Sequence, residues 1–314
     1  MPHDPPRPLV IAHRGASGYL PEHTLAAKAL AHRQGADYLE QDIVATRDGE
    51  LIVLHDVYLE AVTDVATKYA RRARDDGHYY AIDFDLDEIR SLTVTGRERP
   101  DEQRAVLAGE SPPLDEPLRV PTLTEEVALI RELDRSAGRE AGIYPEVKHP
   151  GWHAANGVDL SARLLEQLEQ LGYVESDAPV FVQCFDAGEL RRIRTELGTK
   201  LRLVQLVNDR EIYREMLQPH GLKELAQHAT GISPHYRQLV RYTEASGIEP
   251  SLLAHHTRDA GLLSHPHTFR RARLPVYAPT LEALLDVFLR QVRVNGVFCD
   301  YPDVAVRCRD SLAE

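Results

Sequence analysis

Residues 9–24, LVIAHRGASGYLPEHT, open on a short apolar run that ends in His13, Arg14 and Gly15. An apolar run bounded by a turn-forming glycine is typical of a buried strand. In barrels and open parallel sheets, functional residues gather at the carboxyl ends of the strands. A histidine exchanges protons near neutral pH, and an arginine carries a fixed positive charge. This stretch therefore predicts a site that needs both.

Similar apolar runs recur along the chain, and most are separated by segments with helical periodicity. Gly35 is a candidate helix C-cap, Thr122 and Glu125 form a capping box, and Thr280 precedes another helical segment. Strands that alternate with helices predict a parallel sheet. The predicted strands cover residues 9–13, 38–44, 51–55, 143–148, 180–185, 201–206, 230–234, 262–267 and 296–300.

This pattern predicts an α/β fold, a TIM (β/α)8 barrel with one additional strand. The second and third strands are joined only by ATRDGE, residues 45–50, which is too short for a parallel crossover and indicates an antiparallel hairpin. With Asp48-Gly49 as a two-residue turn, Asp42 should lie opposite His55. This register places an acid beside a histidine.

A long segment after His55-Asp56 interrupts the alternation of strands and helices. Residues 57–120 are charged, exceed the length of an ordinary loop and contain one helical candidate, LDEIRSL, at residues 86–92. We expect residues 1–314 to form a single barrel domain. Within it, residues 57–120 are predicted to be an insertion that caps the barrel mouth.

Composition excludes several classes of protein. The net charge of -12, without runs of Lys or Arg, argues against nucleic acid binding and against stable membrane association. Three cysteines without CxxC spacing indicate a reducing compartment. No signal peptide or apolar span is seen, so we expect a cytoplasmic protein, or a periplasmic or secreted one if a leader precedes this sequence. The oligomeric state stays open, with a homodimer as one option.

Carboxylates cluster near the ends of two predicted strands. Glu40 and Asp42 are two residues apart, as are Glu146 and Lys148, so each pair shares one face of its strand. Crowded carboxylates stay ionised only beside a cation. Oxygen ligands without nearby cysteines suit a hard divalent cation, Ca2+ or Mg2+, better than zinc or an iron-sulfur cluster.

His13 and His55 lie at the same predicted rim and are then available to move protons. Nearby carboxylates should stabilise the imidazolium and raise the pKa of at least one of them. Taken singly, a histidine at a strand end is more often structural, and a buried acid is more often paired with an arginine such as Arg14. Their joint placement at one rim favours a functional site.

Other polar residues are weaker candidates, each with a structural alternative. His265 and His267 either touch substrate or bind zinc, or are satisfied within a turn. Gln183 and Gln205 lie in buried strands, where each either lines the site or bonds to the backbone. Asp300 either holds a catalytic group in place or caps a turn.

The motifs AHRG, PEHT, EQD, HD and PEVK together resemble the glycerophosphodiester phosphodiesterases. The wider run VTDVA, DGHYYAIDF, LDEIRSL, QCFD and HPHT looks like the branch best known as periplasmic, which usually begins with a secretion signal. The resemblance implies a TIM barrel with a small insertion after the His55-Asp56 strand. It also implies one divalent cation, commonly Ca2+ or Mg2+, and hydrolysis of a glycerophosphodiester to sn-glycerol 3-phosphate and an alcohol.

The resemblance also implies roles for individual residues. The resemblance leaves open which histidine is the base. It also leaves open whether water attacks the diester directly or opens a cyclic phosphate formed first. The implied metal ligands are Glu40, Asp42 and Glu146, the acid/base pair is His13 and His55, the phosphate contacts are Arg14 and Lys148, and Glu22 lies near the metal.

Three other functions compete with this hypothesis. A metal-dependent amidohydrolase would normally show His-x-His at the end of the first strand, where this chain has His13-Arg14. A non-catalytic barrel that binds a phosphorylated ligand would tolerate loss of a site residue, yet every position is filled. A lysophospholipase D would need to admit acyl chains. The mixed charges and tyrosines of YARRARDDGHYY favour small water-soluble diesters such as glycerophosphocholine instead.

Overall fold

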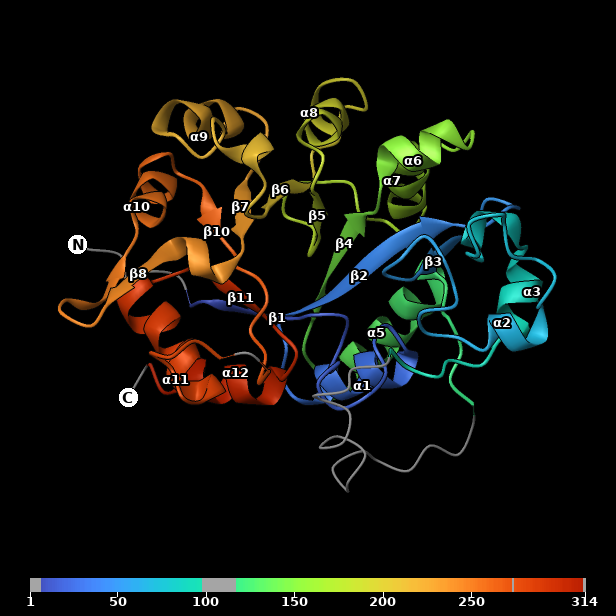
Figure 1. Ribbon diagram of the computed structural model, residues 1–314, viewed down its shortest axis with the longest axis horizontal. Helices are drawn as coiled ribbons and strands as arrows, with labels where there is room; N and C mark the ends of the chain where they lie inside the picture. The colour runs from blue at the N-terminus through green and yellow to red at the C-terminus, as the bar shows by residue number, and fades with distance from the viewer. Residues whose placement is uncertain (1–6, 98–116, 273, 313–314) are drawn as a thin grey trace.

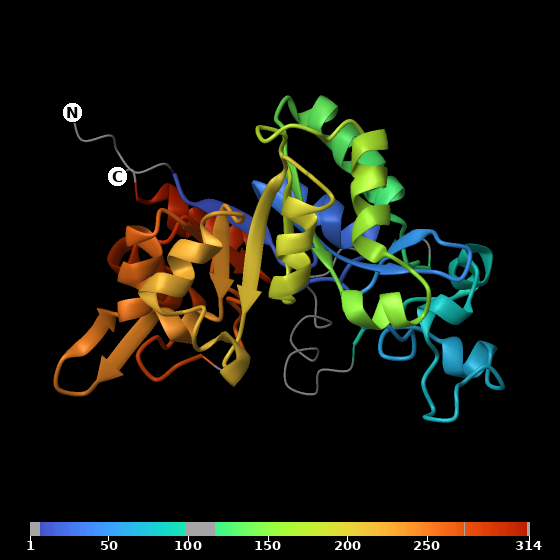
Figure 2. The ribbon, with the colours of Figure 1, turned by 90° about the horizontal axis from the view of Figure 1, so that it is seen from above.

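The computed structural model describes residues 7–97, 117–272 and 274–312, and its centre is a nearly closed barrel of parallel strands surrounded by helices (Figures 1 and 2). Backbone hydrogen bonds join the ends of the strand order, since Phe298 N donates to Pro266 O over 3.1 Å. The predicted TIM barrel is confirmed. In order around the barrel the strands are β10 (Leu263–Ser264), β7 (Gly231–Pro234), β6 (Arg202–Val207), β5 (Phe181–Cys184), β4 (Gly142–Val147), β2 (Tyr38–Ala45), β1 (Leu9–Ala12) and β11 (Gly296–Cys299).

The additional strand β3 (Leu51–Val53) pairs antiparallel with β2, as predicted, but the predicted register is wrong by one residue. Leu54 N donates to Asp42 O over 2.8 Å, so Asp42 faces Leu54 rather than His55. The loop has three residues, 47–49, instead of two. Gly49 ends it with φ of +86°, a left-handed conformation that glycine adopts without steric cost. The extra loop residue shifts the whole pairing.

Helices cover the outside of the barrel, and their predicted caps are confirmed. Thr122 Oγ1 accepts from Glu125 N over 3.1 Å, and Thr280 Oγ1 accepts from Ala283 N over 3.1 Å. Gly35, with φ of +88°, follows the end of the first helix. The helices are α1 (Leu25–Arg33), α5 (Leu123–Ala137), α6 (Pro150–Ala155), α7 (Leu160–Gln170), α8 (Ala187–Thr195), η2 (Glu211–Tyr213), α9 (Pro219–Leu225), η3 (Tyr236–Leu239), α10 (Leu252–Asp259), α11 (Leu281–Asp286), η4 (Val287–Val292) and α12 (Pro302–Asp310).

One pair of strands has no counterpart among the predicted strands. Strands β8 (Val240–Thr243) and β9 (Gly247–Pro250) form an antiparallel hairpin outside the barrel sheet. Their residues are exposed or half-buried, so no alternation of apolar and polar residues marks them in the sequence.

The barrel interior is filled by large side chains rather than by a pore. Tyr144, Phe181 and Phe298 belong to one buried cluster inside the barrel, and the Tyr144 and Phe181 rings stack with centroids 5.0 Å apart. A larger apolar layer lies between the strands and the surrounding helices. This packing holds the strand ends, and hence the side chains they carry, in fixed positions.

The described part of the insertion packs at the side of the barrel, against β2 and β3 (Figures 1 and 2). It contains α2 (Val65–Lys68), η1 (Ala81–Asp83) and α3 (Leu86–Ser91), and α3 confirms the helical candidate LDEIRSL. Leu59, Phe84 and Ile89 form a small core with Ile52 and Leu54. Because residues 98–116 lie outside the described residues, the cap over the mouth and the single-domain boundary stay predictions.

Candidate functional site

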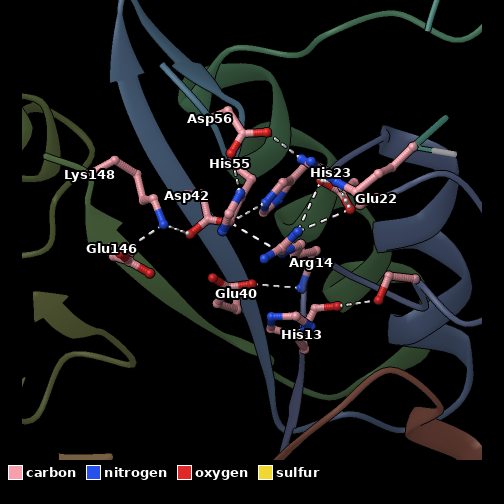
Figure 3. A network of polar contacts seen from close by, with 12 residues as sticks. His13, Arg14, Glu22, His23, Glu40, Asp42, His55, Asp56, Glu146 and Lys148 are labelled. Carbon is pink, nitrogen blue, oxygen red and sulfur yellow. Dashed lines mark hydrogen bonds and ion pairs between the residues drawn. The ribbon is translucent and has the colours of Figure 1, made fainter. Parts of the chain in front are cut away.

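Polar residues from distant parts of the chain meet at the mouth formed by the carboxyl ends of the strands (Figure 3). They come from the loop after β1, from β2, from the segment after β3 and from the end of β4. The structure brings together the residues predicted for metal binding, proton transfer and phosphate contact: His13, Arg14, Glu40, Asp42, His55, Glu146 and Lys148.

The loop after β1 places Arg14 through a sharp turn. Arg14 has φ of +58°, which is uncommon for a residue with a side chain and is often found at functional sites. Its backbone N donates to Glu40 Oε2 over 2.6 Å. A Cβ on Gly15 would lie 2.8 Å from the Ala27 carbonyl carbon, so only glycine allows this approach to α1.

The Arg14 guanidinium lies among carboxylates. Its Nη1 donates to both oxygens of Glu22 over 3.0 Å, and its Nε lies 3.4 Å from Asp42 Oδ2. Arg97, from the insertion, binds the same Glu22 and also donates to Asp56 Oδ2 over 2.6 Å. The insertion therefore contributes a cation to the network around the site.

Glu40, Asp42 and Glu146 form a buried group of carboxylates. Lys148 Nζ lies 3.0 Å from Glu146 Oε1 and 3.5 Å from Asp42 Oδ1. Burial raises the pKa of Asp42, but Lys148 and His23 outweigh it and hold that pKa well below its usual range. Burial and the neighbouring Asp42 raise the pKa of Glu40 well above its usual value, and burial raises the pKa of Glu146 to about 8. Without a metal ion, Glu40 and Glu146 therefore hold their protons more strongly than free carboxyl groups do.

One set of donor atoms is compact enough to hold a metal ion. Atoms of His23, Glu40 and Asp42 lie within 4.8 Å of one another. The predicted set contains Glu146 instead of His23. Glu146 is not a member of this compact group, and its carboxylate pairs with Lys148. His23 Nε2 donates to Asp42 Oδ2 over 2.7 Å, and burial lowers the pKa of His23 to about 3.

His13 and His55 are held in the same way. His13 Nδ1 donates to Asp300 Oδ1 over 2.6 Å, and His55 Nδ1 donates to Asp56 Oδ1 over 2.8 Å. In each ring the carboxylate holds the proton on Nδ1. Nε2 is then the nitrogen left to exchange a proton with a ligand.

The prediction that nearby carboxylates raise the pKa of one of these histidines is wrong. Burial and Arg14 lower the pKa of His13 to about 4, although Asp300 acts in the opposite direction. Burial and Arg14 also lower the pKa of His55. The cost of removing an imidazolium from water exceeds the attraction of the carboxylates, so both rings are neutral at pH 7.

The weaker candidates separate into those near the site and those bound to the backbone. Asp300 contacts His13, one of the two histidines predicted to transfer protons. Gln205 Nε2 donates to the carbonyls of Cys184, Phe185 and Leu206, which makes it a backbone contact. Gln183 pairs in register with Glu146, and within the described part of the chain its Oε1 has no hydrogen-bond partner.

His265 and His267 differ in their surroundings. His265 Nδ1 lies 2.9 Å from Tyr144 Oη, among the aromatic rings of the barrel interior. His267 Nδ1 lies 3.0 Å from Ser233 Oγ, and its pKa is lowered by burial and by charges that include His13 and Lys148. Within the described residues, neither belongs to a candidate metal group.

Three residues of the site were not among the predicted ones. His23 and Asp56 lie inside the motifs PEHT and HD, next to predicted residues, so those motifs already contained the signal. Arg97 lies in no motif and is far from both its partners along the chain. Only the folded insertion reveals its position.

Comparisons with known proteins point to one family. The profile of the glycerophosphoryl diester phosphodiesterase family matches residues 13–304. A glycerophosphodiester phosphodiesterase of Haemophilus influenzae is 38% identical over 322 residues, which cover 95% of this chain and 88% of that protein.

Solved structures show the same fold. A crystal structure of a glycerophosphoryl diester phosphodiesterase homologue from Silicibacter pomeroyi gives a TM-score of 0.72 at 22% identity, covering 98% of this chain and 95% of that chain. An Oleispira antarctica phosphodiesterase in complex with the product sn-glycerol-3-phosphate gives a TM-score of 0.65 at 21% identity, covering 96% and 97% of the two chains. No helix in the described ranges has the length and apolar character needed to span a bilayer.

Proposed function

This chain belongs to the glycerophosphoryl diester phosphodiesterase family, and from that membership we propose how its site hydrolyses glycerophosphodiesters. The family resemblance and the enzyme class predicted from the motifs are confirmed. We infer that one divalent cation and two histidines cleave the diester into sn-glycerol 3-phosphate and an alcohol. The convergence of His13 and His55 with three buried carboxylates at one mouth carries this proposal. The relative from Oleispira antarctica holds sn-glycerol-3-phosphate as its product, which supports the same product here.

The charges of the site suit a divalent cation. When these groups are ionised, five carboxylates and three permanent cations leave an excess of two negative charges, which equals the charge of Ca2+ or Mg2+. Asp300 adds no net charge to this count, because it lies beside Arg270. Glu40 and Asp42 would hold the ion, with Glu146 as a third carboxylate and His23 orienting Asp42. When bound, such an ion withdraws charge from a phosphate oxygen and makes the phosphorus more open to attack. The carboxylates are Glu22, Glu40, Asp42, Asp56 and Glu146, and the cations are Arg14, Arg97 and Lys148.

His13 and His55 supply the proton transfers. One neutral ring accepts the proton of the attacking oxygen at Nε2, and the other, protonated beside the anionic substrate, donates to the departing alkoxide. Asp300 and Asp56 hold the Nδ1 protons and so stabilise the imidazolium that forms. The alcohol leaves as a neutral molecule.

Arg14 and Lys148 supply fixed positive charge for the phosphate. Both lie against Asp42, and Lys148 also lies against Glu146. A phosphate close to these carboxylates therefore meets two cations, which stabilise the charge that builds up on its oxygens.

The test measures release of sn-glycerol 3-phosphate from glycerophosphocholine with chelator, and after Ca2+ or Mg2+ is restored. Glu40→Gln keeps an oxygen that can accept from Arg14 N but removes the charge. We expect it to lower turnover by about 100-fold or more and to weaken metal binding measured by calorimetry. Glu50→Gln, an exposed position on the same hairpin, is the matched control. Full turnover in excess chelator would refute the metal requirement.

A further inference from the structure

A cavity of about 660 Å³ adjoins the site on the side of His55 and Lys148. It shares His55, Glu146 and Lys148 with the site, whereas His13 does not line it. The rest of its lining comes from the ends of β4 and β5 and from the segments that follow β4, β5 and β6, including the first residues of α6 and α8. Its volume lies in the range of pockets for whole small ligands and exceeds the volume that a glycerol fills.

The polar groups of this cavity are mainly hydrogen-bond donors. Its lining includes the Asn208 amide, the Arg210 guanidinium and the indole N–H of Trp152. Arg210 is exposed and Trp152 is half-buried, and both line the cavity, so a ligand there can meet their N–H groups. His149 follows Lys148 with φ of +44°, a strained conformation of the kind found at functional sites, and its exposed ring also lines the cavity.

The apolar part of the lining is held firmly. The Trp152 ring stacks on Tyr80 of the insertion, with centroids 5.3 Å apart. Tyr213 is fixed by its hydroxyl, which donates to Phe185 O over 2.9 Å. Ile212 stands at the open rim and is 72% exposed, so a ligand of varied size can extend past it.

The charges of the cavity disfavour a cationic ligand. Lys148 and Arg210 line it, and the Glu146 carboxylate is already held by Lys148 at 3.0 Å. Asp186 also lines the cavity, but its Oδ1 accepts from Glu189 N over 3.0 Å at the start of α8. Quaternary ammonium groups bind over aromatic rings, and Trp152, Phe185 and Tyr213 offer such rings here. Lys148 and Arg210 line the same cavity, however, and their positive charges repel a cation placed on those rings.

We propose that this cavity binds the alcohol portion of the diester and that it selects a polyhydroxylated alcohol, such as a cyclic polyol, over a quaternary ammonium alcohol. The proposal rests on the proposed function, because the alcohol must leave from a phosphate held at the neighbouring carboxylates. Hydroxyl oxygens accept from Arg210, Asn208 and Trp152, and the alcohol oxygen departs beside His55. The glycerol portion then lies on the side of His13.

The first experiment compares kcat/KM for glycerophosphoinositol and glycerophosphocholine. We expect the wild-type enzyme to favour the inositol diester by about tenfold, and we expect Arg210→Met to abolish that preference through a fall in kcat/KM for the inositol diester. Arg214→Met is the control, since Arg214 is an exposed arginine of the same segment that pairs with Glu211 and does not line the cavity. An equal or reversed preference in the wild-type enzyme would overturn the proposal, as would an unchanged preference in Arg210→Met.

The second experiment observes the cavity directly, because Trp152 is the single tryptophan of the chain. In a His13→Ala variant, which should not consume substrate, glycerophosphoinositol should change the tryptophan emission in a saturable manner. sn-Glycerol 3-phosphate alone should leave the emission unchanged, and the same response to both compounds would overturn the assignment. An emission change without any turnover by the wild-type enzyme would support the cavity and refute the proposed function.

Discussion

Replacement of Asp300 by Asn tests whether Asp300 holds the proton of His13 on Nδ1 and so leaves Nε2 free to transfer a proton. The Asp300 carboxylate is 1% exposed, and its Oδ1 lies 2.6 Å from His13 Nδ1. Asn has nearly the same shape and can still accept through its amide oxygen, but it carries no charge. Arg270, whose Nε lies 3.7 Å from Asp300 Oδ2, would then lose its anionic neighbour as well.

The size of the effect follows from this contact. A buried hydrogen bond to a charged group contributes about 1.5–3 kcal/mol, which corresponds to a loss of about 10- to 100-fold in kcat/KM. The pH profile should change too. Asp300 raises the pKa of His13 against the effect of burial, so its loss lowers that pKa further from about 4. The limb of the profile that reports His13 should therefore move to lower pH.

The assay is product release at a series of pH values, with unfolding followed by circular dichroism. Asp303→Asn is the matched control, because Asp303 is close in sequence but binds Tyr19 and Arg307 at the protein surface. A defect of folding alone would lower activity without moving the pH limb. Wild-type kcat/KM with an unmoved limb in Asp300→Asn would refute the reasoning.

Three further predictions concern the surroundings of the site. Arg97→Met removes the cation that joins Glu22 to Asp56, and we expect kcat/KM to fall by about tenfold, with unchanged kcat/KM as the contrary result. Lys28→Met leaves the fully buried Glu126 unpaired and should lower the free energy of unfolding in urea by about 3–5 kcal/mol; adding Glu126→Leu should restore most of it, and no recovery would contradict the pairing. Histidines with a lowered pKa bind fewer protons in the folded protein than in the unfolded chain. The free energy of unfolding is therefore highest above about pH 6.5 and decreases as the pH falls towards 4. Each of these histidines should lower the free energy of unfolding at pH 5, measured by urea titration, by about 2 kcal/mol. Equal stability at pH 5 and pH 8 would argue against their burial as neutral rings. These histidines are His13, His23, His265 and His267.

The sequence by itself determined the barrel, the family and the main residues of the candidate site, because each depends on local patterns. Apolar runs and caps such as Thr122 mark strands and helices from neighbouring residues alone. The two-residue period of a strand places Glu40 and Asp42 on one face whatever the rest of the chain does. Parallel strands then bring their carboxyl ends, and with them His13 and Lys148, to the same mouth.

Only the tertiary structure decided the features that depend on contacts between distant segments. The hairpin register depended on whether the loop at Gly49 has two or three residues, which the motif Asp-Gly does not distinguish. The insertion had to fold before Arg97 could reach Glu22. The direction of the pKa shift of His13 depended on how much water the whole fold excludes, and burial outweighed the carboxylate that the sequence could place nearby. Local patterns determine which groups meet, whereas solvent exclusion and long-range pairing determine how those groups behave, since both arise from the packing of the entire chain.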